Sequence, residues 1–488
     1  MPQSPTSIVD EISIALANMG SAATGAITPT LRLGVTGLSR AGKTIFITAL
    51  IHRLLTGAAM PGFTPMAEGR FIGARLSEHP QKTIARFAYE QHLQSLTGND
   101  RHWPLSTKRI SQIRLTLKFQ SKRWLSAMTG PSSLNLDIVD YPGEWLLDLP
   151  LLSLSFAQWS EQSLERADRA AMASGNAASK FLDLLATLDS ESEASEALAE
   201  RLAASFTAYL HYSRGDGRAM SALPPGRFLL PGDLEGSPAL TFAPLPKTCR
   251  NSANDSFYAM MARRYEAYKS LVVRPFFRDH FARLDRQIVL VDVLRALNAG
   301  PEAITDLQDA ITGVLACFRQ GANNPLSFIV ARKIDKILLA ATKADHVHHN
   351  ARESLQQILN HLVVDAARNA RFVGAQTRSI ALAAIRATSE GTILDDDKKP
   401  LDCLIGTPLK GEVMDGVTYD GKTEIALFPG DLPKNPDSVF QPSFAPGMLN
   451  FLRFRPPQNL QSTPGGEPVF PHIRLDSAMD YLLKDWMR

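Results

Sequence analysis

The 488-residue chain has little cysteine and no excess of charge of one sign. Its three cysteines, Cys249, Cys317 and Cys403, are odd in number and far apart, which excludes a disulfide framework and a zinc knuckle. Lys and Arg together number 52, and Asp and Glu 49, so we expect no nucleic acid as the main partner. These absences indicate a cytoplasmic protein with reduced thiols.

Long apolar runs are also missing. No stretch approaches the roughly 20 apolar residues that are needed to cross a bilayer. The first 24 residues lack the basic region of a secretory signal and carry Asp10 and Glu11. Because Ile8 and Ile12 share one helical face, we predict an N-terminal amphipathic helix within residues 1–24.

The length exceeds one ordinary core, because domains usually contain about 100–200 residues. Apolar strands that alternate with helices predict a mostly parallel sheet covered by helices on both faces. A long segment with helical periodicity interrupts this pattern, and the C-terminal part has the turn dipeptides of hairpins. We predict two parts of one core, at residues 25–150 and 285–400, which a helical insertion at 151–284 separates. An N-terminal helix precedes them at 1–24, and an extension with hairpins and a terminal helix follows at 401–488.

Six apolar segments have the composition and length of strands. The strand of Ser111–Phe119 alternates apolar and polar residues, whereas the segments from Arg286 onward are nearly continuous apolar runs typical of buried parallel strands. The six predicted strands lie at Leu31–Thr36, Ser111–Phe119, Leu134–Asp140, Arg286–Leu294, Lys336–Thr342 and Ser379–Thr388.

The segment between the first strand and a helix at Ile45–Leu55 reads GLSRAGKT and fits the phosphate-loop pattern G-x-x-x-x-G-K-[ST]. Its backbone N–H groups would wrap two phosphates, Lys43 would reach the β- and γ-phosphates, and the Thr44 hydroxyl would ligate Mg²⁺. The strand–loop–helix context is the one that this motif requires. The predicted nucleotide-binding residues here are Gly37, Ser39, Arg40, Ala41, Gly42, Lys43 and Thr44.

Two further segments are candidates for holding the metal ion and the γ-phosphate. Asp140 ends a buried strand and begins D-x-x-G, so it would hold Mg²⁺ while Gly143 approaches the γ-phosphate. Taken alone, D-x-x-G is also an ordinary turn. We predict Thr107 as the switch threonine that closes over Mg²⁺, with Ser106 as the nearest competitor and a strand cap as the alternative.

A guanine-reading motif follows the strand that begins at Lys336. Guanine presents N1–H and an exocyclic amine side by side, and the Asp345 carboxylate would accept from both, which adenine does not allow. Thr342 and Lys343 complete the Thr-Lys-x-Asp pattern, and the stem of Lys343 would lie over the base. Ala387 and Thr388 follow the last core strand, where GTPases place a short loop behind the base.

The residue after D-x-x-G is Glu144, where many small GTPases carry a water-positioning Gln. A Glu can orient water but adds negative charge beside the γ-phosphate, so we expect slow turnover. Together with Lys43 and Thr107, Glu144 makes up the set of predicted catalytic residues. Arg40 is a candidate stabiliser of transition-state charge, and a surface salt bridge is an equal alternative.

Three histidines, His346, His348 and His349, follow the guanine-reading motif. They lack a paired carboxylate or thiolate at metal-ligand spacing in the sequence. We therefore favour residues that line the loop over a zinc site.

In this order, the motifs and their flanking text resemble the YcjX family of bacterial P-loop GTPases. The resemblance implies an α/β P-loop NTPase of the Ras-like kind, with an inserted, mainly helical domain and a small C-terminal β-containing extension. It also implies slow hydrolysis and a stress-related regulatory role, and it allows peripheral association with a partner at the inner membrane. The segments that carry the resemblance are Gly37–Thr44, Asp140–Glu144, Arg286–Pro301, Lys336–Val347 and Phe428–Pro433.

Two other classes of function compete with a GTPase. One is an ATP-dependent enzyme, such as a small-molecule kinase, with the insertion as a lid; the other is a non-catalytic scaffold that nucleotide stabilises. Asp345 favours guanine, and Lys43, Thr44 and Asp140 favour catalysis. We predict hydrolysis of GTP to GDP and phosphate with Mg²⁺, while the protein effector and the oligomeric state stay open.

Overall fold

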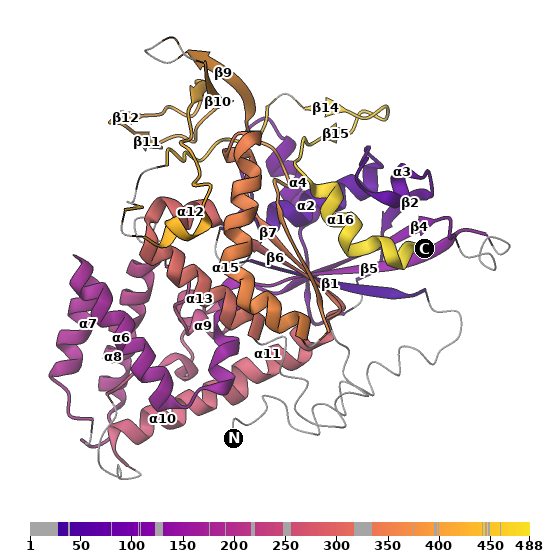
Figure 1. The fold of residues 1–488 in the computed structure, drawn as a ribbon. Helices are drawn as coiled ribbons and strands as arrows, with labels where there is room; N and C mark the ends of the chain where they lie inside the picture. Colours follow the sequence, from indigo (N-terminus) through magenta and orange to yellow (C-terminus); the bar gives the residue numbers. More distant parts are fainter. Residues whose placement is uncertain are drawn as a thin grey trace. The chain divides into compact units, whose positions relative to one another are not determined.

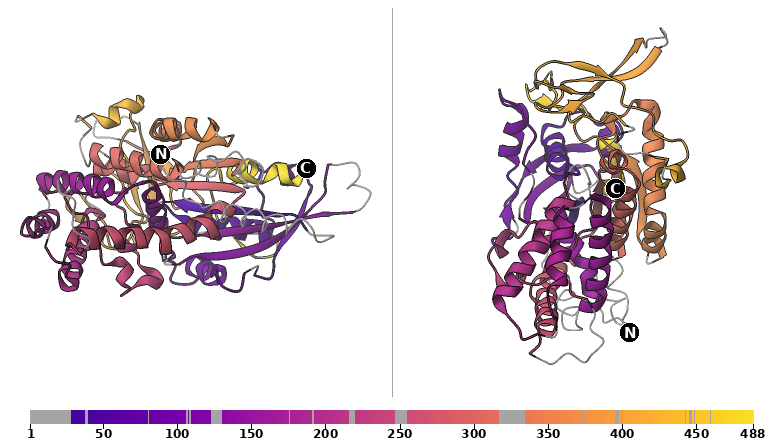
Figure 2. Two further views of the ribbon diagram at one scale, coloured as in Figure 1. Left: turned by 90° about the horizontal axis from the view of Figure 1, so that it is seen from below. Right: turned by 90° about the vertical axis from the view of Figure 1, so that its left-hand side faces the viewer.

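A computed structural model describes most of the chain from residue 28 to residue 488 (Figure 1; two further views in Figure 2). The predicted N-terminal helix, Ser39, Ser106, Cys249 and Cys317 lie outside the described residues. Gaps in the description fall at residues 38–39, 80, 106, 108, 123–129, 175, 191, 216–219, 247–254, 317–333, 373, 395–397, 399, 442, 445–446, 448 and 459.

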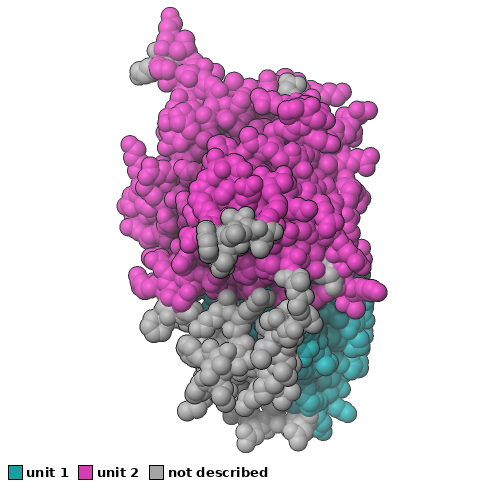
Figure 3. Space-filling model, turned by 90° about the vertical axis from the view of Figure 1, so that its right-hand side faces the viewer, with its two compact units in different colours: residues 1–20, 142–283, 309–332 teal, residues 21–141, 284–308, 333–488 magenta. Residues whose placement is uncertain are grey.

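The described residues form two compact units, which Figure 3 colours teal and magenta. Unit 1 covers 142–283 and 309–316, and unit 2 covers 28–141, 284–308 and 334–488. Each unit thus combines segments that are far apart in the sequence.

Unit 2 is built on a mixed sheet that, within the described residues, has eight strands in the order β2-β4-β5-β1-β6-β7-β8, with β3 beside β4. The strands β5, β1, β6, β7 and β8 run parallel, whereas β4 is antiparallel to β5 and β2 is antiparallel to β4. The strands are β1 (Thr30–Gly37), β2 (Phe71–Leu76), β3 (Ala85–Arg86), β4 (Ser111–Phe119), β5 (Ser132–Asp140), β6 (Arg286–Val291), β7 (Lys336–Ala341) and β8 (Gln376–Ala381).

Helices cover the central strands of this sheet. Every residue of β6 and β7 is buried, as expected for parallel strands with helices on both faces. Helices α2 (Lys43–Thr56), α4 (Tyr89–Thr97) and α16 (Leu475–Leu483) share one apolar core with β1 and β5. Helix α15 (Arg352–Phe372) packs on β7 and β8 (Figure 1). The prediction of a mainly parallel sheet with many helices is confirmed.

The predicted strand at Arg286–Leu294 was wrong at its C-terminal end. Strand β6 stops at Val291, and α12 (Val293–Ala299) begins two residues later. The Asp292 carboxylate accepts a hydrogen bond from the backbone N–H of Arg295 at 3.3 Å and so caps the new helix. An apolar run does not distinguish a strand from the buried helix that follows it.

The last predicted core strand, Ser379–Thr388, was also misplaced. Strand β8 spans Gln376–Ala381, and the chain then leaves the sheet. Ala383 instead pairs with Ile473, and the backbone N–H of Arg386 donates to Pro471 O at 2.7 Å. The segment after β8 therefore pairs with the C-terminal part of the chain and not with a strand of the sheet, although Leu382 and Ile385 still belong to the core of unit 2.

The C-terminal part of unit 2 holds small antiparallel sheets. β10 (Pro400–Gly406) pairs with β9 (Ser389–Leu394) and with β13 (Ile425–Leu427). In the hairpin of β11 (Val413–Met414) and β12 (Val417–Thr418), both turn residues, Asp415 and Gly416, have positive φ, as a two-residue turn requires. A second hairpin joins β14 (Gln461–Ser462) and β15 (Pro468–Val469). Because β9 pairs with β10, this sheet begins before the expected boundary at residue 400.

The described part of unit 1 consists mainly of helices. No helix in the described part of the chain is long and apolar enough to cross a membrane. Trp159 is fully buried at its centre, stacks on Tyr265 at a centroid distance of 5.0 Å and meets Phe206 and Phe242 edge-on. Such aromatic packing buries a large apolar area. Its helices include η1 (Gly143–Ser153), α6 (Phe156–Ser174), α7 (Asn176–Ala186), α8 (Glu196–Ser213), α9 (Gly226–Leu229), α10 (Phe257–Tyr268), the π-helix η4 (Lys269–Val273) and α11 (Arg274–Asp279). Helix α13 (Pro301–Ala316) belongs to both units.

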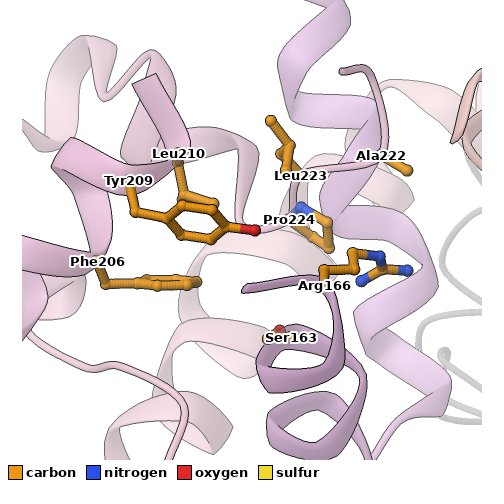
Figure 4. A pocket seen from close by; sticks show the side chains of 8 residues that line it. All are labelled: Ser163, Arg166, Phe206, Tyr209, Leu210, Ala222, Leu223 and Pro224. Carbon is orange, nitrogen blue, oxygen red and sulfur yellow. The ribbon is translucent and has the colours of Figure 1, made fainter. Parts of the chain in front are cut away.

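A small pocket lies in unit 1 (Figure 4). Its cavity volume of about 10 Å³ holds roughly one water molecule, so it cannot accept a nucleotide. The residues that line it are Ser163, Arg166, Phe206, Tyr209, Leu210, Ala222, Leu223 and Pro224.

Unit 1 also contains a buried carboxyl group, that of Asp148. Its two oxygens accept from the backbone N–H of Gly226 and from the Tyr268 hydroxyl, both at 2.6 Å. Burial raises the pKa of Asp148 to about 6, although these hydrogen bonds act in the opposite direction. The folded state therefore binds a proton more tightly than the unfolded chain, and this contribution to stability is lost as the pH rises from about 4 to about 6.

We expect Asp148→Asn to gain stability relative to the wild type as the pH rises from 4.5 to 7. The asparagine keeps the shape of the carboxyl group but never ionises, so the difference in unfolding free energy should change by about 2 kcal/mol in its favour. Thermal unfolding across this pH range measures the difference. Asp183→Asn, at an exposed site on α7, is the control and should show none. A difference for Asp148→Asn that does not vary with pH would contradict the assignment.

Candidate nucleotide-binding site

The phosphate-loop segment joins the end of β1 to the start of α2. Gly37 must be glycine, because a Cβ there would lie 2.9 Å from Leu290 O. Gly42 has φ +84° and precedes the helix, and its carbonyl accepts from the Phe46 N–H at 2.9 Å. Arg40 also takes positive φ, at +62°. Two residues of the loop, Arg40 and Gly42, thus have a left-handed backbone conformation, which can turn neighbouring backbone N–H groups toward an anion.

The first turn of α2 is suited to an anionic ligand. It holds no acidic residue, and Gly42 has no side chain to cap its N–H groups, so the positive end of the helix dipole stays open. The Lys43 Nζ donates to Gly37 O at 3.0 Å and so lies back over the loop. Ala41 is buried against the sheet, whereas Arg40 is exposed.

Three of the predicted metal-binding side chains meet in unit 2. The Thr107 hydroxyl donates to Asp140 Oδ2 at 2.5 Å and lies 3.3 Å from the Thr44 hydroxyl. Asp140 is opposite Val35 in the β1–β5 register, which brings the end of β5 beside the phosphate loop. Two hydroxyls and a carboxylate are hard oxygen donors, and their spacing suits the small octahedral Mg²⁺ ion.

The residues predicted to read the base also meet, at the ends of β7 and β8. Asp345 is only 3% exposed, and its Oδ2 accepts from the backbone N–H of Ala387 at 2.7 Å. The Thr388 hydroxyl donates to Asp345 O at 2.5 Å. Thr342 is buried, and its N–H donates to Val291 O at 2.9 Å. The hydrogen bond from Ala387 thus orients the Asp345 carboxylate, and the other two bonds fix the backbone around it.

Sequence reasoning missed Asp292, which holds Lys343, the lysine predicted to lie over the base. Asp292 Oδ2 accepts from Lys343 Nζ at 2.5 Å, and Lys343 has a left-handed backbone with φ +59°. Because β6 and β7 are neighbours, with Val291 opposite Ala341, the residues that follow these strands meet. The position of an acid directly after a buried strand was the available signal.

We expect Asp292→Asn to weaken guanine-nucleotide affinity about 3- to 10-fold. The asparagine can still cap α12, but it no longer holds the charged end of Lys343 through an ion pair. Titration with a fluorescent GDP analogue measures the loss, with the exposed Asp431→Asn as the matched control. Unchanged affinity in Asp292→Asn would show that the ion pair does not orient Lys343.

Comparison with known proteins agrees with this geometry. The sequence model of the YcjX-like family, DUF463, matches residues 31–487. The chain belongs to the YcjX-like family. A protein of Escherichia coli (strain K12) named "Ras-like GTPase YcjX" is 37% identical over 472 residues, which cover 94% of this chain and 96% of that protein. A protein of the same name from Shewanella oneidensis is 34% identical over 480 residues, 93% of this chain and 94% of its own length.

The family membership inferred from the motifs is thereby confirmed. In this YcjX-like chain the parallel part of the sheet, in the order β5-β1-β6-β7-β8 with β4 antiparallel at its side, is consistent with a Ras-like GTPase. Apart from Thr107, which precedes the antiparallel strand β4, the predicted phosphate-loop, metal-binding and base-reading residues of this sheet lie at or after the carboxyl ends of parallel strands, where α/β folds bind ligands.

Gly143 and Glu144 belong to unit 1, at the start of η1. Gly143 is buried, and Glu144 Oε1 accepts from Arg214 Nη2 at 2.7 Å. The sequence showed no signal for Arg214, because it lies 70 residues further along the chain.

The histidine group of the YcjX-like chain does have carboxylate neighbours, contrary to the sequence-based argument. His349 Nδ1 lies 2.9 Å from Glu390, and the two histidines with Glu390 could form a three-ligand cluster. Glu390 is already paired with Arg352 and lies 3.4 Å from Arg386. Burial raises the Glu390 pKa, but the contact with His349 and the two guanidinium groups outweigh it, so the Glu390 pKa is lowered. The loop-lining role of the histidines stays a prediction.

Proposed function

We propose that this chain binds GTP together with Mg²⁺ and hydrolyses it to GDP and phosphate. The observation that carries this proposal is the buried Asp345 carboxylate, which Ala387 orients at the end of β7. Guanine offers two adjacent N–H donors to a carboxylate, and adenine does not. The name of the two relatives, Ras-like GTPase, supports the same choice.

The phosphates would bind to the loop between Gly37 and Thr44. Lys43 would exchange its present acceptor, Gly37 O, for oxygens of the β- and γ-phosphates. The Thr44 and Thr107 hydroxyls and the Asp140 carboxylate would hold Mg²⁺, which neutralises phosphate charge when it is bound. The backbone N–H of Gly143 would approach the γ-phosphate, as D-x-x-G does in GTPases.

Glu144 would orient the attacking water, and hydrolysis would be slow. A carboxylate near the γ-phosphate is repelled by it, unlike the neutral glutamine of many small GTPases. Arg40 stays a candidate for stabilising transition-state charge, because its backbone belongs to the phosphate loop.

From the family resemblance we also propose a regulatory role. In this proposal the chain is a cytoplasmic, stress-related switch, and unit 1 is the element that a protein effector reads. A partner at the inner membrane is compatible with this role. The physical basis of such a switch is that segments ordered by the γ-phosphate are released on hydrolysis.

The test is a titration of the full-length wild type with GTP, ATP and xanthosine triphosphate, with and without Mg²⁺, together with phosphate release. We expect GTP to bind at least about 100-fold more tightly than ATP and turnover below about 0.1 s⁻¹. Chelation of Mg²⁺ should weaken triphosphate binding. Tighter binding of ATP than of GTP would overturn the proposal and favour an ATP-dependent enzyme.

A further inference from the structure

The Glu144 side chain is held by an arginine from a distant helix of unit 1. Arg214 follows directly after α8 and donates through Nη2 to Glu144 Oε1 at 2.7 Å. Both side chains are only 14% exposed. An ion pair that is this well shielded from solvent is short and directional, in contrast to a surface salt bridge.

The backbone of Glu144 is also held. A Cβ at Gly226 would lie 1.7 Å from the Glu144 carbonyl oxygen, so the chain at Gly226 packs directly on it. The N–H of Gly226 donates to Asp148, in the same helix η1, at 2.6 Å. These contacts prevent the start of η1 from shifting toward α9.

The next residue, Trp145, completes this support. The Arg227 guanidinium lies 3.1 Å from the centroid of the indole ring, and the indole N–H donates to Leu230 O at 2.9 Å. Trp145 is 3% exposed. With the backbone held on one side and the carboxylate on the other, Glu144 has one defined position within unit 1.

Glu144 is tethered by the chain to the metal-binding residues of unit 2. Glu144 lies four positions after Asp140 in the sequence, so their Cα atoms can lie at most about 14 Å apart. Tyr141 is fully buried in unit 2, where its hydroxyl donates to Gln287 at 3.2 Å. The segment that carries Glu144 therefore starts from an anchored point.

We propose that Arg214 is a positioning residue for GTP hydrolysis. It neutralises the Glu144 carboxylate and fixes its direction, so that the carboxylate can accept a hydrogen bond from the attacking water. The inference rests on the proposed function. The ion pair with Arg214 offsets part of the charge that an unpaired carboxylate would bring, so the pair would substitute, less effectively, for the neutral glutamine of many small GTPases.

The experiment compares full-length Arg214→Gln and Arg214→Lys with the wild type by single-turnover GTP hydrolysis and by GTP affinity. We expect Arg214→Gln to lower the hydrolysis rate at least about 10-fold while the affinity changes less than about 2-fold, because only the water loses its orientation. Arg214→Lys keeps the charge and should restore most of the rate. Arg201→Ala, at an exposed site on α8, is the matched control and should hydrolyse like the wild type.

A second comparison separates positioning from a structural role. In a Glu144→Gln background no charge needs neutralising, so adding Arg214→Gln should change the rate less than about 2-fold. Equal effects of Arg214→Gln in both backgrounds, or a wild-type rate in the single variant, would overturn the inference alone. A wild type that binds GTP without hydrolysing it would overturn the proposed function as well. Circular dichroism and thermal unfolding show whether each variant is folded.

Discussion

Asp345→Asn is expected to change the preferred base from guanine to xanthine. The backbone N–H of Ala387 needs an acceptor, so the amide oxygen of the asparagine should turn toward it and present the NH₂ group to the base. An NH₂ group faces the guanine amine donor to donor, whereas it can donate to the O2 of xanthine. The loss of two hydrogen bonds to a charged acceptor costs about 3–5 kcal/mol, which is a loss of GTP affinity of roughly 100- to 4,000-fold.

Titrations with GTP and xanthosine triphosphate measure this change. The fold should survive, because the second contact of this loop, from Thr388, goes to the main-chain oxygen of Asp345. Asp431→Asn, at an exposed site in the same unit, provides the matched control. If Asp345→Asn binds the two nucleotides in the same ratio as the wild type does, Asp345 does not contact the base.

Lys43→Ala is expected to weaken binding of GTP at least about 100-fold. The variant lacks the ammonium group that would make charge-assisted hydrogen bonds to two phosphates. In the structure the Lys43 ammonium donates to Gly37 O, and the side chain is half-buried, so unfolding free energy should change by less than about 1 kcal/mol.

Isothermal titration with GTP and Mg²⁺ measures the loss for Lys43→Ala, and thermal unfolding without nucleotide checks the fold. The exposed Lys82→Ala in the same unit controls for the removal of one positive charge. Retention of GTP affinity within about 3-fold would mean that the phosphates do not bind at the loop between Gly37 and Thr44. Loss of both the fold and the affinity would instead assign Lys43 a structural role.

The strand boundaries show what a local sequence pattern can and cannot predict. The alternating pattern of β4 predicted its bounds correctly at Ser111–Phe119, because one face of this strand must be apolar along its whole length. The continuous apolar runs at Arg286–Leu294 and Ser379–Thr388 did not mark where β6 and β8 end. A buried helix and a buried loop satisfy the same apolar composition as a buried strand.

In the candidate site, too, some residues could be predicted from the sequence and others could not. The residues between Gly37 and Thr44, and those between Thr342 and Asp345, could be named from the sequence because each group is contiguous. Phosphate wrapping and base recognition need a loop or turn directly after a strand, so the chemistry leaves a short local pattern. The family membership followed from these patterns in their order along the chain.

Other partners in the site come from distant segments and leave no local pattern. Asp292 meets Lys343 because β6 and β7 are neighbours in the sheet, and Glu390 meets His349 through the small C-terminal sheet. Arg214 reaches Glu144 across the helices of unit 1. Each pair depends on the packing of elements that are 41 to 70 residues apart in the sequence.

The sequence by itself determined the family, the mainly parallel sheet and the contiguous motifs. Its few cysteines, balanced charge and short apolar runs excluded a disulfide framework, a zinc knuckle and nucleic acid as the main partner from the expected functions. Only the tertiary structure decided which charged groups lie next to Glu144 and Lys343. The reason is that backbone conformation and apolar periodicity are local properties, whereas ion pairs and buried hydrogen bonds form between residues that only the packing of the chain brings together.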